Sequence, residues 1–400
     1  MTGGGNMENY SKWVACWGNA TSIITQTATN YSKDLTLRYP IWMCFSGSAL
    51  RIHFSNLTGT EPVSFRAGVA RAVTDKTIDP ATMKPLTKDG DEQLTIMPGE
   101  EIVTDILEYD ITAGEKLSVN MFLEGYAQMN SGTLVTGPLS KGFYSYGDHR
   151  SEAEMPIDLT RNTNWFYFIN TVDVLTEEKN MALICYGDSI TAQAWPDYLK
   201  LYAWENNYRN VSVIRRAVSG TRILRQYDCI TYAGYGLKGE TRFPIEGQAA
   251  GATTILIQHG INDIIHPVGT DENVFRPWSD MPDAEDLIEG VKNFYIKTAR
   301  ERGLSVWCGT LLPIYGWRTY AEFREKIRTE YNQWVRTTDL IDGYIDFDDQ
   351  ICNFEHGEQF DDGNDSGDHL HPSELGYQRM AKAALPLVRM LSKGLSDLSE

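Results

Sequence analysis

The sequence predicts two domains of different fold class: an all-β sandwich over residues 1–175 and an α/β domain with a parallel sheet over residues 176–400. Three observations predict this division. Short runs rich in β-branched and aromatic residues dominate the first part. Apolar strands alternate with helical patterns in the second part, which is typical of a parallel sheet with helices on both faces. A charged, turn-like segment at residues 175–180 separates the two patterns.

The first part contains many strand candidates and no long helical pattern. Polar and apolar residues alternate in segments such as 51–54, which is the period of a half-buried strand. Gly and Asn clusters separate these segments, as expected for turns. Many short strands without a helix favour a sandwich, which we expect to be jelly-roll-like. The strand candidates are residues 35–45, 49–54, 63–73 and 117–123.

The second part alternates five apolar strand candidates with helical patterns. The strands are predicted at residues 182–186, 212–214, 254–258, 304–310 and 343–347. The main helices are predicted at residues 283–302, 320–337 and 372–391. Ligands of open parallel sheets bind beyond the carboxyl ends of the strands. We therefore expect the functional residues at those ends.

The charge and hydropathy of the chain exclude several classes of partner. Lys plus Arg number 36 and Asp plus Glu number 54, so the net charge is −18. Such an acidic surface disfavours nucleic acid and anionic membranes as partners. No run approaches the length of a transmembrane helix. No apolar segment follows residues 1–7, so we expect no signal peptide and a cytoplasmic location. The oligomeric state is not readable from the sequence.

The cysteines are scattered and form no C-x-x-C pair, which argues against a disulfide framework or a zinc site. The six cysteines are Cys16, Cys44, Cys185, Cys229, Cys308 and Cys352.

Three polar motifs follow predicted strands directly. Ser189 stands in Gly187-Asp188-Ser189, where glycine lets the chain turn sharply and project the serine. Gly220 follows the second strand, and its N–H could serve as an oxyanion donor. Asn262 follows the third strand, and its side-chain amide could do the same. Each motif by itself is also ordinary turn chemistry.

The fourth motif, Asp368-His369-Leu370-His371, lies near the C-terminus. A carboxylate three residues before an imidazole can accept its Nδ1 proton, which orients the ring as a general base for a serine. The alternative is a metal site, because Asp368, His369 and His371 are all possible ligands. No companion cluster of ligands stands near another predicted strand end, so we expect no metal.

Together these four motifs resemble the SGNH (GDSL-type) serine hydrolase superfamily. The resemblance implies a three-layer α/β/α catalytic domain that needs no cofactor. It implies a triad of Ser189, Asp368 and His371. It also implies an oxyanion hole made by the N–H groups of Ser189 and Gly220 and the side chain of Asn262.

The similarity extends to a bacterial two-domain branch with an N-terminal β-sandwich. Segments 195–199, 310–313 and 50–56 carry this part of the resemblance. Two positions depart from the pattern. Ala192 stands where a glycine often follows the threonine, and Val218 stands where a glycine often precedes the donor glycine. The G-x-S-x-G elbow of α/β-hydrolases is absent around Ser189.

The predicted function is a serine esterase for short-chain esters, most plausibly O-acetyl groups of a small molecule or oligosaccharide. Aromatic side chains such as Trp195, Trp278 and Trp317 could stack on sugar rings, although core packing is the commoner role of a tryptophan. Two alternatives stay open at this point. One is an acyltransferase that uses the same triad, and the other is a non-catalytic carbohydrate-binding protein.

Overall fold

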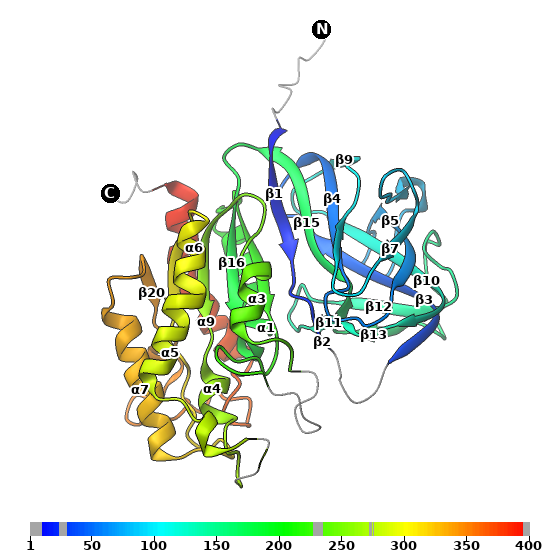
Figure 1. The fold of residues 1–400 in the computed structure, drawn as a ribbon. Helices are drawn as coiled ribbons and strands as arrows, with labels where there is room; N and C mark the ends of the chain where they lie inside the picture. Colours follow the sequence, from blue (N-terminus) through cyan, green and yellow to red (C-terminus); the bar gives the residue numbers. More distant parts are fainter. Residues whose placement is uncertain (1–9, 24–29, 227–234, 272–273, 275, 395–400) are drawn as a thin grey trace.

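The computed structural model describes residues 10–23, 30–226, 235–271, 274 and 276–394 (Figure 1). Residues 1–7 and Cys229, which were considered in the sequence analysis, lie outside these ranges.

The C-terminal half is built on a five-stranded sheet in the order β17-β16-β18-β19-β20, and every pairing in it is parallel. This confirms the predicted parallel sheet. The strands are β16 (Met181–Gly187), β17 (Val211–Ala217), β18 (Ala252–Gln258), β19 (Ser305–Gly309) and β20 (Gly343–Ile345). The chain reverses direction across the sheet after β17, so the topological switch point lies between β16 and β18, and ligands of such sheets bind at the carboxyl ends of these strands.

Helices cover both faces of this sheet, which confirms the predicted three-layer architecture (Figure 1). One group contains α2 (Trp195–Glu205), α8 (Phe347–Ile351) and α9 (Glu374–Lys393), which pack against one another. The other contains α3 (Gly239–Glu246), α4 (Ile261–Ile265), α5 (Ala284–Gly290), η4 (Val291–Ile296), α6 (Lys297–Glu301) and α7 (Glu322–Thr337). The predicted helix 283–302 is thus interrupted by η4, a π-helical segment.

The N-terminal half consists of antiparallel sheets that face each other, as the alternating patterns predicted. One sheet contains β1 (Tyr10–Gly18), β15 (Ile169–Glu177), β4 (Gly47–Ser55), β8 (Glu101–Val103) and β9 (Leu107–Ile111). The largest contains β13 (Arg161–Thr163), β12 (Gly142–Tyr146), β3 (Tyr31–Trp42), β10 (Lys116–Gln128), β5 (Val63–Arg71), β6 (Lys84–Pro85) and β7 (Gln93–Ile96). A small sheet contains β14 (Trp165–Tyr167), β11 (Ser131–Leu134) and β2 (Ser22–Ile23). The rings of Phe54, Phe65 and Phe168 pack together in the core of the N-terminal half.

The two halves share one continuous hydrophobic core. β1 lies against β17, where the Ser212 hydroxyl donates to the Ala15 carbonyl at 2.6 Å. The Ala15 N–H donates to the Ala250 carbonyl at 2.9 Å. β15 belongs to the N-terminal half and ends at Glu177. The domain boundary after residue 175 and the jelly-roll connectivity stay predictions.

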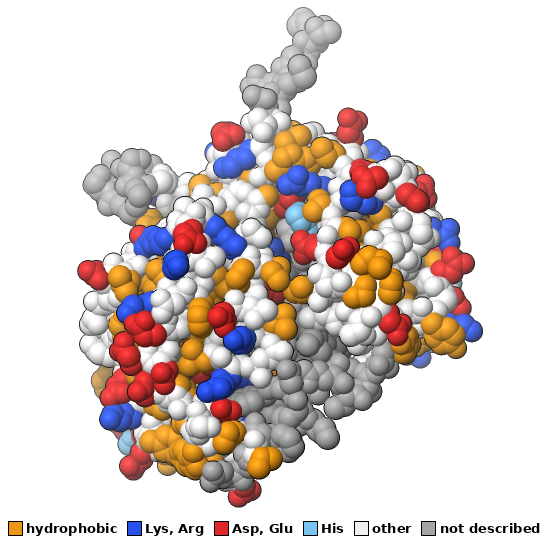
Figure 2. Space-filling model, in the orientation of Figure 1, with side chains coloured by type: hydrophobic (Ala, Val, Ile, Leu, Met, Phe, Trp, Pro, Cys, Tyr) orange, Lys and Arg blue, Asp and Glu red, His pale blue; other side chains and the backbone are white. Residues whose placement is uncertain are grey.

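Acidic and basic side chains are interspersed over the face shown in Figure 2, without a continuous basic patch. Within the described ranges, no helix is both long and apolar enough to span a bilayer.

Candidate active site

Ser189 is the first residue of α1 (Ser189–Ala192), directly after β16. A Cβ at Gly187 would collide with the Gln258 carbonyl oxygen of β18, so glycine is required for this close approach. The Asp188 carboxylate caps α1 by accepting from the Ile190 N–H at 3.1 Å. The Ser189 N–H has no intrahelical acceptor because it lies in the first turn.

The Ser189 hydroxyl contacts an imidazole that lies 182 residues later in the chain. Ser189 Oγ is 2.8 Å from Nε2 of His371, and Nδ1 of His371 is 2.7 Å from Oδ2 of Asp368. The second carboxylate oxygen of Asp368 accepts from the N–H groups of Leu370 and His371. These bonds close the turn that precedes α9 and hold the carboxylate against the ring.

The surroundings of Asp368 favour its ionised form. Partial burial raises the pKa of Asp368, but hydrogen bonds from the His371 N–H, the His371 ring and the Leu370 N–H lower it by more. The net pKa lies below the ordinary value, so Asp368 carries a negative charge near neutral pH. Such a charge next to Nδ1 of His371 favours the tautomer that carries its proton on Nδ1.

Gly220 lies in a tight turn after β17, with φ of +75°. The turn is closed by Thr221, whose hydroxyl donates to the Val218 carbonyl at 2.7 Å. The Val218 N–H donates to the Gly187 carbonyl at 3.2 Å, which ties the turn to the end of β16. A Cβ at Gly220 would collide with the Tyr235 ring, so the position requires glycine for both its backbone angle and its neighbour. Val218, which stands where the SGNH pattern often has a glycine, is compatible with this turn.

Asn262 lies in α4, directly after β18, and is 2% exposed. One N–H of its amide donates to the Thr221 carbonyl at 3.0 Å. An amide nitrogen carries two N–H groups, and only one of them is taken by the described residues. The structure thus brings Ser189, His371 and Asp368 into one hydrogen-bonded chain, and it joins Asn262 to the turn of Gly220 through Thr221.

Two further carboxylates are buried beside these elements. Burial raises the pKa of Asp188 to about 7 and that of Asp263 to about 6. Asp263 accepts from the N–H groups of Ile223 and Leu224 at 2.8 and 2.9 Å. It therefore fastens the chain beyond Gly220 to the helix that carries Asn262.

A second imidazole–carboxylate pair lies in the same turn as the first. His369 Nδ1 is 2.6 Å from Oδ2 of Asp365, and the His369 ring lies over Gly316. Asp368 and His369 are therefore each bound to a different partner, rather than converging with His371 as metal ligands. Among the described residues, no group of three or more His, Cys, Asp and Glu side chains is arranged to hold a metal ion.

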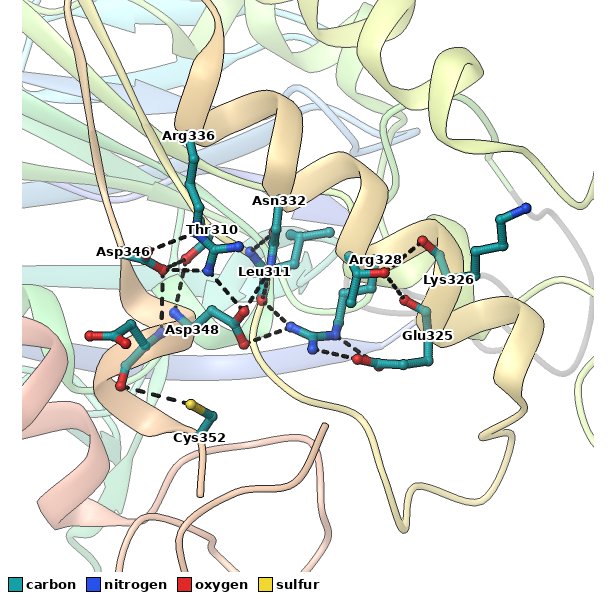
Figure 3. A network of polar contacts seen from close by, with 12 residues as sticks. Thr310, Leu311, Glu325, Lys326, Arg328, Asn332, Arg336, Asp346, Asp348 and Cys352 are labelled. Carbon is teal, nitrogen blue, oxygen red and sulfur yellow. Dashed lines mark hydrogen bonds and ion pairs between the residues drawn. The ribbon is translucent and has the colours of Figure 1, made fainter. Parts of the chain in front are cut away.

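A polar network fixes the loop that follows β19 (Figure 3). Arg328 of α7 donates to the Leu311 carbonyl at 2.9 Å and to Asp348 at 2.7 Å. The Asn332 amide accepts from the Leu311 N–H and donates to the Leu311 carbonyl. Both polar groups of Leu311 are therefore held by α7. The loop then continues to Gly316 beneath His369.

Three residues surround Thr221, and sequence reasoning gave no role to two of them, Arg242 and His259. The Arg242 guanidinium, the His259 ring and the Asn262 amide all contact it. Burial and the positive charges of Arg242 and Arg222 lower the pKa of His259 to about 3, so this ring is neutral. Arg242 stands in a helical segment without any recognisable motif, so no local signal pointed to it. Trp195 is fully buried against Phe347 and therefore offers no sugar platform.

Residues 185–379 match the family model described as "GDSL-like Lipase/Acylhydrolase family". No curated protein matches the chain. Among solved structures, a GDSL-like lipase from Bacteroides thetaiotaomicron is 15% identical with a TM-score of 0.39, over 53% of this chain and 89% of that chain.

Two carbohydrate esterases are similar at the same level. A family two carbohydrate esterase from Clostridium thermocellum, solved with cellohexaose, is 15% identical over 92% of this chain and 93% of that chain, with a TM-score of 0.37. A family 3 carbohydrate esterase from Talaromyces cellulolyticus is 16% identical over 53% of this chain and 98% of that chain, with a TM-score of 0.36.

Proposed function

Residues 185–379 belong to the GDSL-like lipase/acylhydrolase family, which makes the protein a hydrolase of carboxylic esters, and on this premise we propose a serine esterase mechanism. Ser189 is the nucleophile, His371 the general base and Asp368 the carboxylate that orients it. The observation that carries this proposal is the unbroken chain from Ser189 Oγ to His371 Nε2 at 2.8 Å and from His371 Nδ1 to Asp368 at 2.7 Å.

The reaction proceeds by two acyl transfers. His371 takes the proton of Ser189 as its Oγ attacks the ester carbonyl, and the resulting oxyanion accepts from the N–H groups of Ser189 and Gly220 and from the Asn262 amide. His371 then protonates the leaving alcohol, and an acyl-enzyme remains on Ser189. Water, deprotonated by His371, attacks this ester, and His371 returns the proton to Ser189 Oγ as the bond to the acyl group breaks and the acid is released. These side chains perform every proton transfer, so the mechanism calls on no cofactor.

The substrates that we propose are short-chain esters, in particular O-acetyl groups on a neutral sugar or oligosaccharide. The net charge of −18 disfavours docking on anionic lipid surfaces and on nucleic acid. An aromatic ring lies close to the imidazole turn: Tyr315 is 45% exposed and precedes Gly316, on which His369 packs. The Tyr320 ring supports it edge-on at 4.9 Å. Such a ring suits stacking on a sugar face.

Replacement of the nucleophile tests the mechanism. Ser189→Ala is expected to abolish ester hydrolysis and covalent labelling by a fluorophosphonate probe, while circular dichroism and the melting temperature stay close to those of the unmodified protein. Ser219 in the adjacent turn provides the control, because Ser219→Ala should still be labelled. Labelling of a folded Ser189→Ala protein would overturn the assignment.

A substrate series tests the acyl and sugar parts separately. We expect kcat/KM on p-nitrophenyl esters to be highest for the acetate and to fall through the butyrate, octanoate and dodecanoate. Acetate release from acetylated xylan and cello-oligosaccharides tests the sugar. A maximum at the octanoate or beyond would refute the short acyl chain, and the absence of acetate release from every acetylated saccharide would refute the sugar.

A further inference from the structure

Thr221 contacts both the turn of Gly220 and the side chain of Asn262, which are two of the proposed oxyanion donors. Its hydroxyl donates to the Val218 carbonyl at 2.7 Å and closes the turn of Gly220. Its carbonyl accepts from the Asn262 amide at 3.0 Å. A displacement of Thr221 would therefore move the Gly220 N–H and the Asn262 amide together.

Arg242 ties Thr221 to the ends of the two strands that precede the site. Its side chain is fully buried in α3. One terminal nitrogen donates to the Thr221 hydroxyl at 2.8 Å and lies 3.5 Å from the Gly187 carbonyl. The other donates to the Arg216 carbonyl at 3.1 Å. A planar guanidinium can serve these acceptors at once in one fixed geometry, whereas an ammonium group cannot match them.

Glu246, one turn further along α3, holds the guanidinium in place. Arg242 Nε donates to one of its carboxylate oxygens at 2.6 Å. The other oxygen accepts from the Thr21 N–H of the N-terminal half at 3.2 Å. Burial lowers the pKa of Arg242, but Glu246 together with Tyr186 and Tyr295 raises it by more, so the guanidinium keeps its charge. The Arg242–Glu246 pair thus connects the N-terminal half to the turn of Gly220.

We propose that Arg242, held by Glu246, is a positioning residue for the oxyanion hole and acts on Gly220 and Asn262 through Thr221. This inference rests on the proposed function of those two donors. Arg242 touches no reacting atom, and its effect is to hold two donors where charge develops in the transition state. Donors displaced by about 1 Å lose on the order of a hundredfold in rate. Loss of Arg242 should therefore lower kcat and leave KM nearly unchanged.

The test uses the full chain with p-nitrophenyl acetate. Arg242→Lys keeps the charge beside Glu246 and should lower kcat by about tenfold to a hundredfold. The double variant Arg242→Met/Glu246→Met removes both charges, avoids an unpaired buried carboxylate and should lose as much. Arg38→Met is the matched control, because Arg38 is as deeply buried and donates to Asn120 and to several carbonyls of the sandwich. It should lower the melting temperature without lowering kcat.

A double-mutant cycle separates positioning from general stability. Thr221→Val removes the hydroxyl through which Arg242 acts, so Arg242→Lys should cost less than about threefold in that background. An equal cost in both backgrounds would overturn the proposal, as would a raised KM with unchanged kcat. An equal loss of kcat in Arg38→Met would do the same. Failure of the proposed function has a different signature, because Ser189→Ala would then remain active.

Discussion

Two imidazole–carboxylate pairs lie side by side in one turn, and only one of them reaches a nucleophile. His371 with Asp368 and His369 with Asp365 have nearly the same separation, 2.7 and 2.6 Å. Each carboxylate also accepts from nearby backbone N–H groups. The His371 ring is 22% exposed and contacts Ser189, whereas the His369 ring is 51% exposed and lies on Gly316.

Under the proposed mechanism, the position of an imidazole–carboxylate pair, rather than the pairing itself, confers the chemistry. His369 adopts a φ of +63°, which is uncommon for a residue other than glycine. This backbone angle lets neighbouring histidines point in different directions, one outward and one toward the end of β16. An imidazole whose Nδ1 is paired with a carboxylate can act as a general base only where a hydroxyl lies at its Nε2. We expect His369 to contribute to the rim of the site instead.

The largest predicted effect separates the two histidines. His371→Ala removes the proposed general base and should lower kcat by about 10⁴ to 10⁶-fold. His369→Ala should stay within about tenfold of the unmodified protein, because general-base catalysis does not pass through it. Steady-state hydrolysis of p-nitrophenyl acetate measures both. Comparable losses in the two variants would show that the second pair takes part in catalysis.

The carboxylates of the two pairs, Asp368 and Asp365, are expected to differ in their effect on kcat in the same way as the histidines. Asp368→Asn places an amide N–H opposite Nδ1, favours the wrong tautomer of His371 and should cost about 10⁴-fold in kcat. Asp365→Asn should have a small effect on kcat and a measurable effect on the melting temperature, since Asp365 also accepts from the N–H groups of Gly367 and His369. Near-normal activity of the Asp368 variant would remove this residue from the triad.

The oxyanion donor is expected to have an intermediate effect. Asn262→Ala should lower kcat by about 10² to 10³-fold with little change in KM, because the amide acts on the transition state. Asn120→Ala is the matched control, since Asn120 is also buried and donates to a backbone carbonyl, but in the sandwich. If both variants lose only stability, Asn262 does not belong to the oxyanion hole.

The smallest effect concerns Asp188, whose pKa shift is opposite to that of Asp368. Burial raises the pKa of Asp188 to about 7, so the folded protein keeps a proton that the unfolded chain releases near pH 4. The free energy of unfolding should therefore fall as the pH rises from about 4 to about 7, and Asp188→Asn should remove this part of the decline. Urea denaturation across this range measures it. Parallel pH profiles for the two proteins would contradict the raised pKa.

Much of the fold was predictable because its signals are local. The strands β16, β17 and β18 are buried over most of their length, and the apolar runs within them marked the parallel sheet. The strands β3, β4, β5 and β10 were recognised by composition and alternation. The interruption of helix 283–302 by η4 was not predicted, because it depends on which backbone carbonyl accepts from each N–H. β15 runs to Glu177, past the predicted boundary, because the charged residues near its end still pair with β1.

The sequence alone predicted which residues carry the chemistry and at which edge of the sheet they lie. Ser189, Gly220 and Asn262 each follow a parallel strand, and the carboxyl ends of such strands share one edge of the sheet. The spacing of Asp368 and His371 within one turn is likewise a local property. Only the tertiary structure decided that His371 faces the serine while His369 turns to Gly316. It also decided that Arg242 and Glu246 support Thr221, because contacts between distant segments follow from how helices and sheets pack, and no local spacing encodes them.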